Sequence, residues 1–223
     1  MSRVARHPLF MRTEMKKLLL TSDGLTSPAL GKRFLELVGK DSEDIKVLFV
    51  PTASERKHDE AYLKRKTAYF DQCEEILVGF GVKKEHMVWL DINNILAAGD
   101  INSYDAMFVC GGNTFYLLHE IRRTGFDKKI IEFIGQGKLY IGESAGSILV
   151  GPSILIATPF DENDIGLTDN IGLKMTEKII CPHYNKKEKD LIDAFEKEHN
   201  CEVVRLKDGQ AVEVLDGVSK INK

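Results

Sequence analysis

The residues best suited to chemistry in this 223-residue chain lie in the segment Gly142-Glu143-Ser144-Ala145-Gly146. A serine nucleophile is often presented on a sharp turn between a strand and a helix, where small neighbours are needed because the backbone is strained. An apolar run at 139–141 precedes the segment and a helix-compatible run at 147–150 follows it. The pattern predicts a nucleophile elbow at Ser144; the alternative is a glycine-containing turn that matches by chance.

A serine is a poor nucleophile at neutral pH, so Ser144 needs a base beside its hydroxyl group. Among the six histidines, His183 follows an apolar strand-like run at 178–181 and begins a loop. From that loop its imidazole could reach across the edge of a sheet toward Ser144. His183 is therefore the expected general base, and an ordinary loop histidine is the alternative.

The acid that would orient the histidine has several candidates. Asp161, Asp164 and Asp169 precede His183, whereas Asp208 follows a predicted strand at 202–206. The order nucleophile, acid, histidine that is typical of α/β-hydrolases would select one of the earlier aspartates. Asp208 has the placement at a strand end, so the choice stays open on these patterns.

An oxyanion hole is predicted from two backbone N–H groups. The glycines of Gly111-Gly112-Asn113-Thr114 follow an apolar run and could direct an N–H group toward developing negative charge, while Ala145 supplies another from the elbow. The rival interpretation, a turn before a helix capped by Asn113 or Thr114, is compatible with this role. We expect Gly112 and Ala145 to form the hole. The substrate-binding candidates are Asn113, Glu143, Asn185 and Lys186.

These motifs require a scaffold that brings strand ends together. Apolar runs and helical periodicities alternate along the chain and predict an α/β fold with a mostly parallel sheet. The predicted strands are 17–21, 45–50, 88–90, 106–109 and 139–141, and the predicted helices are 28–38, 58–80, 114–123 and 128–135. The motif-bearing loops follow strands, so they are expected at the carboxyl edge of the sheet, where ligands bind.

Composition excludes several classes of function. The net charge of −3 offers no basic field for nucleic acid, and the longest apolar stretch, 147–160, is too short to cross a membrane. Four widely spaced cysteines indicate free thiols in a reducing cytoplasm rather than a metal site. No phosphate loop, dinucleotide fingerprint or metal-binding helix occurs in the sequence, so no cofactor and no metal are expected.

Two segments carry expectations of their own. Residues 1–16 are basic and lack a signal-peptide core, which predicts a disordered extension before one α/β domain at 17–223. Met11 or Met15 could be the natural start. The polar segment 160–174 could be a lid over the site or a surface loop.

Three motifs in order resemble those of the aspartyl dipeptidase (dipeptidase E) family of serine peptidases. They are Gly111-Gly112-Asn113-Thr114-Phe115, the elbow segment, and Pro182-His183-Tyr184. The resemblance implies a flavodoxin-like three-layer sandwich with helices on both faces of the sheet, related to class I glutamine amidotransferases, and peptide hydrolysis without metal or cofactor. It implies Ser144 as nucleophile, His183 as base and Asp208 as acid, with Asp161 as the nearest fallback.

The chain departs from this family where substrate is selected. Well-known members prefer an amino-terminal aspartate and hold its carboxylate with an arginine beyond the histidine, whereas no arginine follows His183 until Arg205. Lys186 is a weaker substitute because an ammonium binds carboxylates less directionally. We expect a serine exopeptidase that hydrolyses short peptides through a Ser-His-Asp triad, with an acidic amino-terminal residue as a candidate preference, and that is a monomer or homodimer. The alternatives are a hydrolase of non-peptide amides or esters and a non-catalytic binding module.

Overall fold

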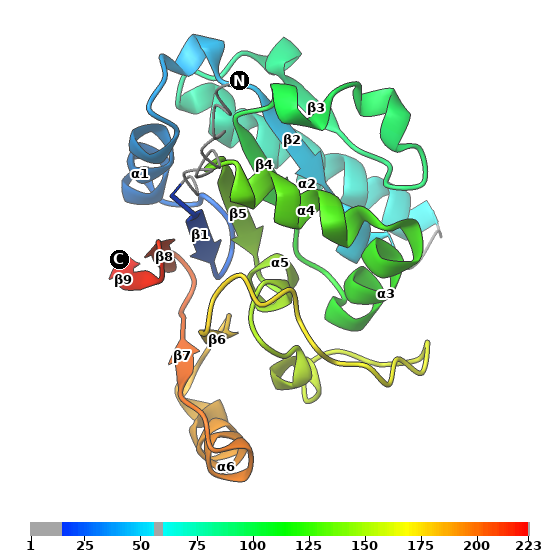
Figure 1. Cartoon of the computed structure of the whole chain (residues 1–223), viewed down its shortest axis with the longest axis vertical. Helices are drawn as coiled ribbons and strands as arrows, with labels where there is room; N and C mark the ends of the chain where they lie inside the picture. Colours follow the sequence, from blue (N-terminus) through cyan, green and yellow to red (C-terminus); the bar gives the residue numbers. More distant parts are fainter. Residues whose placement is uncertain (1–14, 56–59, 223) are drawn as a thin grey trace, which may run out of the picture.

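The computed structural model describes residues 15–55 and 60–222, with the backbone alone for residues 60–67. Within these ranges the main sheet consists of β1 (Lys17–Thr21), β2 (Val47–Val50), β3 (Met87–Trp89), β4 (Ala106–Val109), β5 (Leu139–Glu143), β8 (Ala211–Leu215) and β9 (Val218–Asn222). The strand order is β3-β2-β4-β5-β1-β8-β9 (Figure 1). Strands β1 to β5 are parallel, whereas β8 and β9 are antiparallel to their neighbours.

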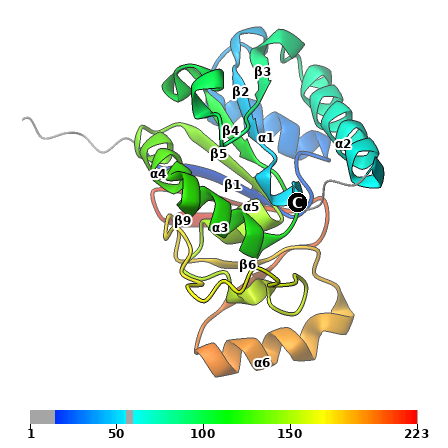
Figure 2. The same ribbon diagram turned by 90° about the vertical axis from the view of Figure 1, so that its right-hand side faces the viewer.

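Helices cover both faces of this sheet because both faces of the parallel strands are apolar. They are α1 (Pro28–Val38), α2 (Glu60–Gly79), α3 (Thr114–Thr124), α4 (Phe126–Gly135) and α5 (Ala145–Leu149). Leu19 and Phe49 pack with buried residues of α1 and α2, while Leu20 and Leu48 pack with those of α3, α4 and α5. Figure 2 shows the resulting layers. The expected α/β three-layer sandwich is confirmed.

A second, smaller sheet lies beyond the ends of β1 and β5. Strands β6 (Ile179–Cys181) and β7 (Val203–Arg205) pair in parallel and are connected by α6 (Lys189–His199). Figure 1 shows this unit set apart from the main sheet. The loop that leaves β6 and the loop that leaves β7 therefore approach the carboxyl edge of the main sheet from outside it.

The apolar pattern of the sequence does not predict the β8–β9 hairpin. Its turn contains Asp216 and Gly217, which have φ values of 46° and 84°. Because an Asp-Gly pair favours the positive φ values of a tight hairpin turn, this dipeptide in the sequence predicts the turn. The hairpin matters because Ala211 pairs with Thr21, which brings the segment before β8 to the carboxyl end of β1.

Element limits differ from the predicted ones by a few residues. Helix α4 begins at Phe126 rather than at 128, because Gly125, with φ 73°, ends α3 and immediately begins the next helix. Residues 1–14 of the expected amino-terminal extension at 1–16 lie outside the described residues. In the described ranges no helix is both long and apolar enough to cross a membrane.

Candidate active site

Ser144 lies at the strained junction between β5 and α5. Its φ and ψ are 48° and −107°, a conformation that costs a non-glycine residue about 1–3 kcal/mol. The flanking glycines make it possible, because a Cβ on Gly142 would lie 2.7 Å from the backbone of Gly146, and one on Gly146 would lie 2.2 Å from the Val109 oxygen. The elbow geometry thus explains why this motif needs glycine on both sides of the serine.

His183 contacts the serine from the loop after β6. Its Nε2 lies 3.1 Å from Ser144 Oγ, and its own φ is 54°. The backbone N–H of His183 donates to Ser22 Oγ at 2.7 Å, while the next N–H along the chain donates to the Leu206 oxygen. The small sheet and the loop after β1 together hold the imidazole at the serine.

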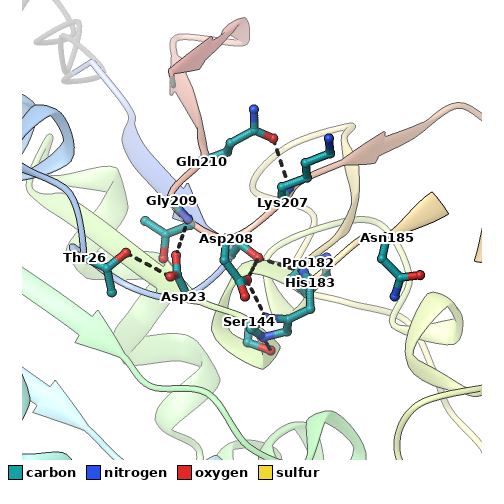
Figure 3. A network of polar contacts seen from close by, with 12 residues as sticks. Asp23, Thr26, Ser144, Pro182, His183, Asn185, Lys207, Asp208, Gly209 and Gln210 are labelled. Carbon is teal, nitrogen blue, oxygen red and sulfur yellow. Dashed lines mark hydrogen bonds and ion pairs between the residues drawn. The ribbon is translucent and has the colours of Figure 1, made fainter. Parts of the chain in front are cut away.

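Asp208 lies on the far side of the imidazole. Its Oδ1 is 2.7 Å from His183 Nδ1 (Figure 3). The same oxygen accepts a second hydrogen bond from Ser22 Oγ at 2.9 Å. The neighbouring Gly209 N–H donates to Asp23 Oδ1 at 2.8 Å, which ties the turn to the loop after β1. Ser144, His183 and Asp208 therefore form one continuous line of contacts.

The fallback acid has a different set of partners. Asp161 Oδ2 accepts the backbone N–H of Thr114 at 2.8 Å, at the amino terminus of α3. Asp169 forms an ion pair with Arg122 at 3.3 Å. The geometry thus joins His183 to the carboxylate of Asp208.

Two backbone N–H groups near the serine are free to bind a ligand. Within the described ranges, neither the N–H of Gly112 nor that of Ala145 has a hydrogen-bond acceptor. Gly112 has φ 140°, and a Cβ there would lie 2.3 Å from the carbonyl carbon and oxygen of Ala53. Only glycine fits this position, so the loop between β4 and α3 depends on it.

Two of the four substrate-binding candidates, Asn113 and Asn185, form helix caps. Asn113 caps α3 by accepting the Tyr116 N–H at 2.8 Å, which matches the rival interpretation of this segment. Asn185 forms a capping box with Glu188, and Figure 3 shows its side chain away from Ser144. Lys186 is exposed. Local helix capping therefore accounts for both asparagines.

Glu143 precedes the serine but belongs to a different environment. Its Oε2 accepts the Tyr69 hydroxyl and, at 3.2 Å, the backbone N–H of Gly111. Burial raises the pKa of the Glu143 carboxyl and also that of the Tyr69 phenol. The contact with Tyr69 was not anticipated, because it joins residues 74 positions apart and no local pattern marks it.

Two cavities flank the elbow. The serine cavity, of about 240 Å³, is lined by Ser144, His183, Ile148, Phe160, Asp161 and Glu188, among others. The glutamate cavity, of about 300 Å³, is lined by Glu143, Tyr69, Cys73, Asp23 and Phe108, among others. Substrate that reaches Ser144 Oγ must occupy the serine cavity. In the described part of the chain, no cluster of three or more His, Cys, Asp or Glu side chains could hold a metal ion.

The loop after β1 supplies residues that the sequence patterns did not single out. Ser22 contacts both His183 and Asp208, and Asp23 holds the turn that carries Asp208. The loop was visible as a polar segment after a strand, but its partners lie more than 160 positions away. Sequence spacing carries no signal for such contacts.

An α/β sandwich with a serine on a strained elbow, facing a histidine, is the arrangement found in hydrolases that use a serine nucleophile. The model of peptidase family S51 matches residues 18–221, and the chain belongs to that family. The resemblance to dipeptidase E is thereby confirmed, and the protein is a peptidase.

Relatives and solved structures agree with this family. The uncharacterized peptidase Lmo0363 of Listeria monocytogenes is 36% identical over 178 residues, which cover 77% of this chain and 79% of that protein. Peptidase E of Streptomyces coelicolor is 30% identical over 99 residues, covering 43% of this chain and 40% of that protein. A crystal structure described as a peptidase E protein from L. monocytogenes superposes with a TM-score of 0.74 at 28% identity, covering 94% of this chain and 98% of that one.

Proposed function

We propose that the protein is a serine exopeptidase that hydrolyses short peptides through Ser144, His183 and Asp208. The line of contacts from Ser144 Oγ to His183 Nε2 and from His183 Nδ1 to Asp208 carries this proposal. As Oγ attacks the scissile carbonyl carbon, Nε2 accepts its proton. Asp208 accepts the Nδ1–H, which holds the imidazole in the required tautomer and stabilises the imidazolium that forms.

The attack converts the carbonyl oxygen into an oxyanion. We assign its stabilisation to the N–H groups of Gly112 and Ala145, which have no acceptor among the described residues. Collapse of the tetrahedral intermediate breaks the C–N bond, and His183 gives its proton to the leaving amine. Water, deprotonated by His183, then hydrolyses the acyl-enzyme and restores Ser144.

The size of the serine cavity supports short substrates. Its volume of about 240 Å³ is below the roughly 300–1,000 Å³ of cavities that enclose drug-sized ligands. The expected preference for an acidic amino-terminal residue has less support. Arg205, the arginine nearest after His183 in the sequence, is paired with Asp193 and Glu196 at 2.8 Å.

The location of the protein is also a proposal. We infer that it works in the cytoplasm, since Cys73, Cys110, Cys181 and Cys201 are all free thiols. Free cysteines persist in reducing compartments, whereas oxidising ones favour disulfides.

The test compares wild type with Ser144→Ala on a dipeptide library under metal-free conditions. We expect loss of turnover by roughly 10³-fold or more, as for other serine nucleophiles. Ser103→Ala, at an exposed serine that lines neither cavity, is the matched control and should retain turnover. Substantial turnover by Ser144→Ala, with contaminating peptidase excluded, would overturn the proposal.

A second measurement separates the alternatives. An aryl phosphonate that labels activated serines should modify Ser144 selectively, as seen by peptide mass spectrometry. Labelling without cleavage of any peptide would favour hydrolysis of a non-peptide amide or ester. A Ser144 no more reactive than Ser103 would favour a non-catalytic binding module.

A further inference from the structure

The polar lining of the serine cavity is acidic. Apart from Ser144 and His183, the titratable side chains that face it are Asp161, Glu188 and Cys181, and the cavity residues include no lysine or arginine. Its remaining walls are largely apolar, with Ile148, Ile156 and Phe160 among them. A ligand in this cavity therefore meets negative charge and apolar surface together.

Asp161 is held in a fixed position within this lining. One carboxylate oxygen, Oδ2, accepts the Thr114 N–H at 2.8 Å at the amino terminus of α3. The next residue is also held at the start of this helix, since Asn113 Nδ2 donates to the backbone carbonyl oxygen of Glu162 at 2.8 Å. Oδ1 has no hydrogen-bond donor among the described residues, so it can accept one from a ligand.

An exopeptidase that cuts next to the amino terminus places a charged group close to the reacting atoms. The α-ammonium group of the substrate is separated from the scissile carbonyl carbon by one Cα atom. When that carbonyl carbon lies at Ser144 Oγ, the ammonium group lies in the same cavity. Removing it from water is costly unless a hydrogen-bonded anion meets it there.

We propose that Asp161 binds the α-ammonium group of the substrate, and that Asp161 and Glu188 together select neutral or basic amino-terminal residues over acidic ones. This inference rests on the proposed peptidase function and adds its substrate class. Asp161 is then a specificity-determining residue for exopeptidase action. The apolar walls accept the side chain of the amino-terminal residue.

Glu188 contributes charge and not a free hydrogen-bonding group. Its two carboxylate oxygens accept the Asn185 N–H at 3.0 Å and the Asn185 amide at 2.5 Å. Both donors are neutral, so the negative charge is not cancelled by them. A substrate carboxylate in the cavity would face two like charges, which disfavours it.

The competing arrangement uses Lys186. This exposed lysine lies two positions before Glu188 and could reach an acidic side chain at the rim of the cavity. It would predict the opposite selectivity, with amino-terminal aspartate preferred. The charge of the amino-terminal side chain that the protein prefers distinguishes the two arrangements.

The experiment measures kcat/KM on Ala-Leu, Lys-Leu, Asp-Leu and N-acetyl-Ala-Leu. Wild type should cleave the first two at least roughly 10-fold more efficiently than the last two. Asp161→Asn keeps an acceptor for the Thr114 N–H and removes only the charge. It should lower kcat/KM for Ala-Leu by roughly 10- to 100-fold, mainly by raising KM. The ratio of kcat/KM for Ala-Leu to kcat/KM for N-acetyl-Ala-Leu should therefore become smaller.

Two further variants sharpen the test. Glu188→Gln should raise the efficiency on Asp-Leu relative to Ala-Leu by roughly 3- to 10-fold. Asp190→Asn, which removes one charge from an exposed position on α6, is the matched control and should keep the wild-type ratios.

Several results would overturn the inference alone. One is that wild type has the same kcat/KM on Ala-Leu and on N-acetyl-Ala-Leu. Another is that Asp161→Asn lowers kcat/KM equally on both peptides. The third is that wild type prefers Asp-Leu and that Lys186→Gln removes this preference. The wild-type comparison of free and acetylated peptides remains decisive even if a variant fails to fold. Absence of any Ser144-dependent peptide cleavage would instead overturn the proposed function, and this inference with it.

Discussion

Two cavities on either side of one elbow show how neighbouring residues acquire different chemistry. Glu143 ends β5 in the glutamate cavity, where its Oε2 accepts two hydrogen bonds. Ser144 faces the serine cavity, where it meets a histidine whose side chain is about half exposed, at 52%. Adjacent positions in the chain thus differ in burial and in hydrogen-bond partners, and these differences decide which of them can react.

The ionisable groups in and near the glutamate cavity are poor nucleophiles. Burial raises the pKa of the Cys73 thiol, which lines this cavity, to about 12. It also raises the pKa of Cys110, which is buried in the core and does not line the cavity. A thiol with a raised pKa supplies little thiolate at neutral pH, so these cysteines are poor nucleophiles. In the mechanism that we propose, the serine cavity carries the reaction and the glutamate cavity supports the elbow.

Glu143 also contacts the loop between β4 and α3. The N–H of Gly111 is bound by Glu143, whereas the next N–H, that of Gly112, has no acceptor among the described residues. The glutamate therefore helps to orient the peptide unit that we assign to the oxyanion hole. We therefore propose that Glu143 positions this loop and is not a catalytic residue.

The largest effect on rate is expected from a substitution of Asp208 at the serine cavity. We expect Asp208→Asn to lower kcat by roughly 10²- to 10⁴-fold, because the amide does not stabilise the imidazolium and permits the wrong tautomer of His183. Steady-state kinetics on Ala-Leu would measure it, with Asp190→Asn as the matched control. A fall of less than threefold would remove Asp208 from the proposed mechanism and return attention to Asp161.

A smaller effect is expected at the oxyanion hole. Gly112→Ala forces a Cβ to within 2.3 Å of the Ala53 backbone, so the loop must shift and misplace its N–H. We expect kcat to fall by roughly 10²- to 10³-fold. Gly135→Ala, at a glycine with open space around its Cβ position, is the control and should be active. Near-normal kcat in Gly112→Ala with an unchanged fold would exclude this N–H from the hole.

The smallest effect on rate is expected in the glutamate cavity. Glu143→Gln should lower kcat by only about threefold, because the amide oxygen can still accept a hydrogen bond from the Tyr69 hydroxyl or the Gly111 N–H. The matched control is Glu85→Gln at an exposed site. A loss as large as that of Asp208→Asn would show that Glu143 belongs to the reacting machinery.

The same variant should alter the pH dependence of stability. Because the pKa of Glu143 is raised in the folded state, its protonated form favours folding at low pH, and this contribution is lost as pH rises through the folded pKa. The free energy of unfolding of wild type relative to Glu143→Gln should therefore fall as pH rises from acidic toward neutral. Denaturant unfolding at several pH values measures this, and a difference that rises with pH would contradict the raised pKa.

Local patterns were informative where local geometry sets the requirement. The elbow depends on Gly142 and Gly146 because their Cβ positions are occupied by nearby backbone, and the motif shows this directly. The alternation of strands and helices likewise predicted the α/β fold with a mostly parallel sheet, which is confirmed. Asn113 illustrates the limit of such patterns, because a cap residue and a substrate ligand look the same in sequence.

The sequence by itself determined the order of the motifs, the family they belong to and the strand ends where they lie. Only the tertiary structure decided that Asp208 is the carboxylate that contacts His183, and that Ser22 contacts both of these residues. It also decided that Glu143 and Ser144 face different cavities. The physical reason is distance along the chain: Ser22 and Asp208 are 186 positions apart, and Ser144 and His183 are 39 apart. Backbone strain and helix capping are local and leave marks in the sequence, whereas these contacts exist only once the pairing of β8 with β1, and the small sheet beyond it, have brought the loops together.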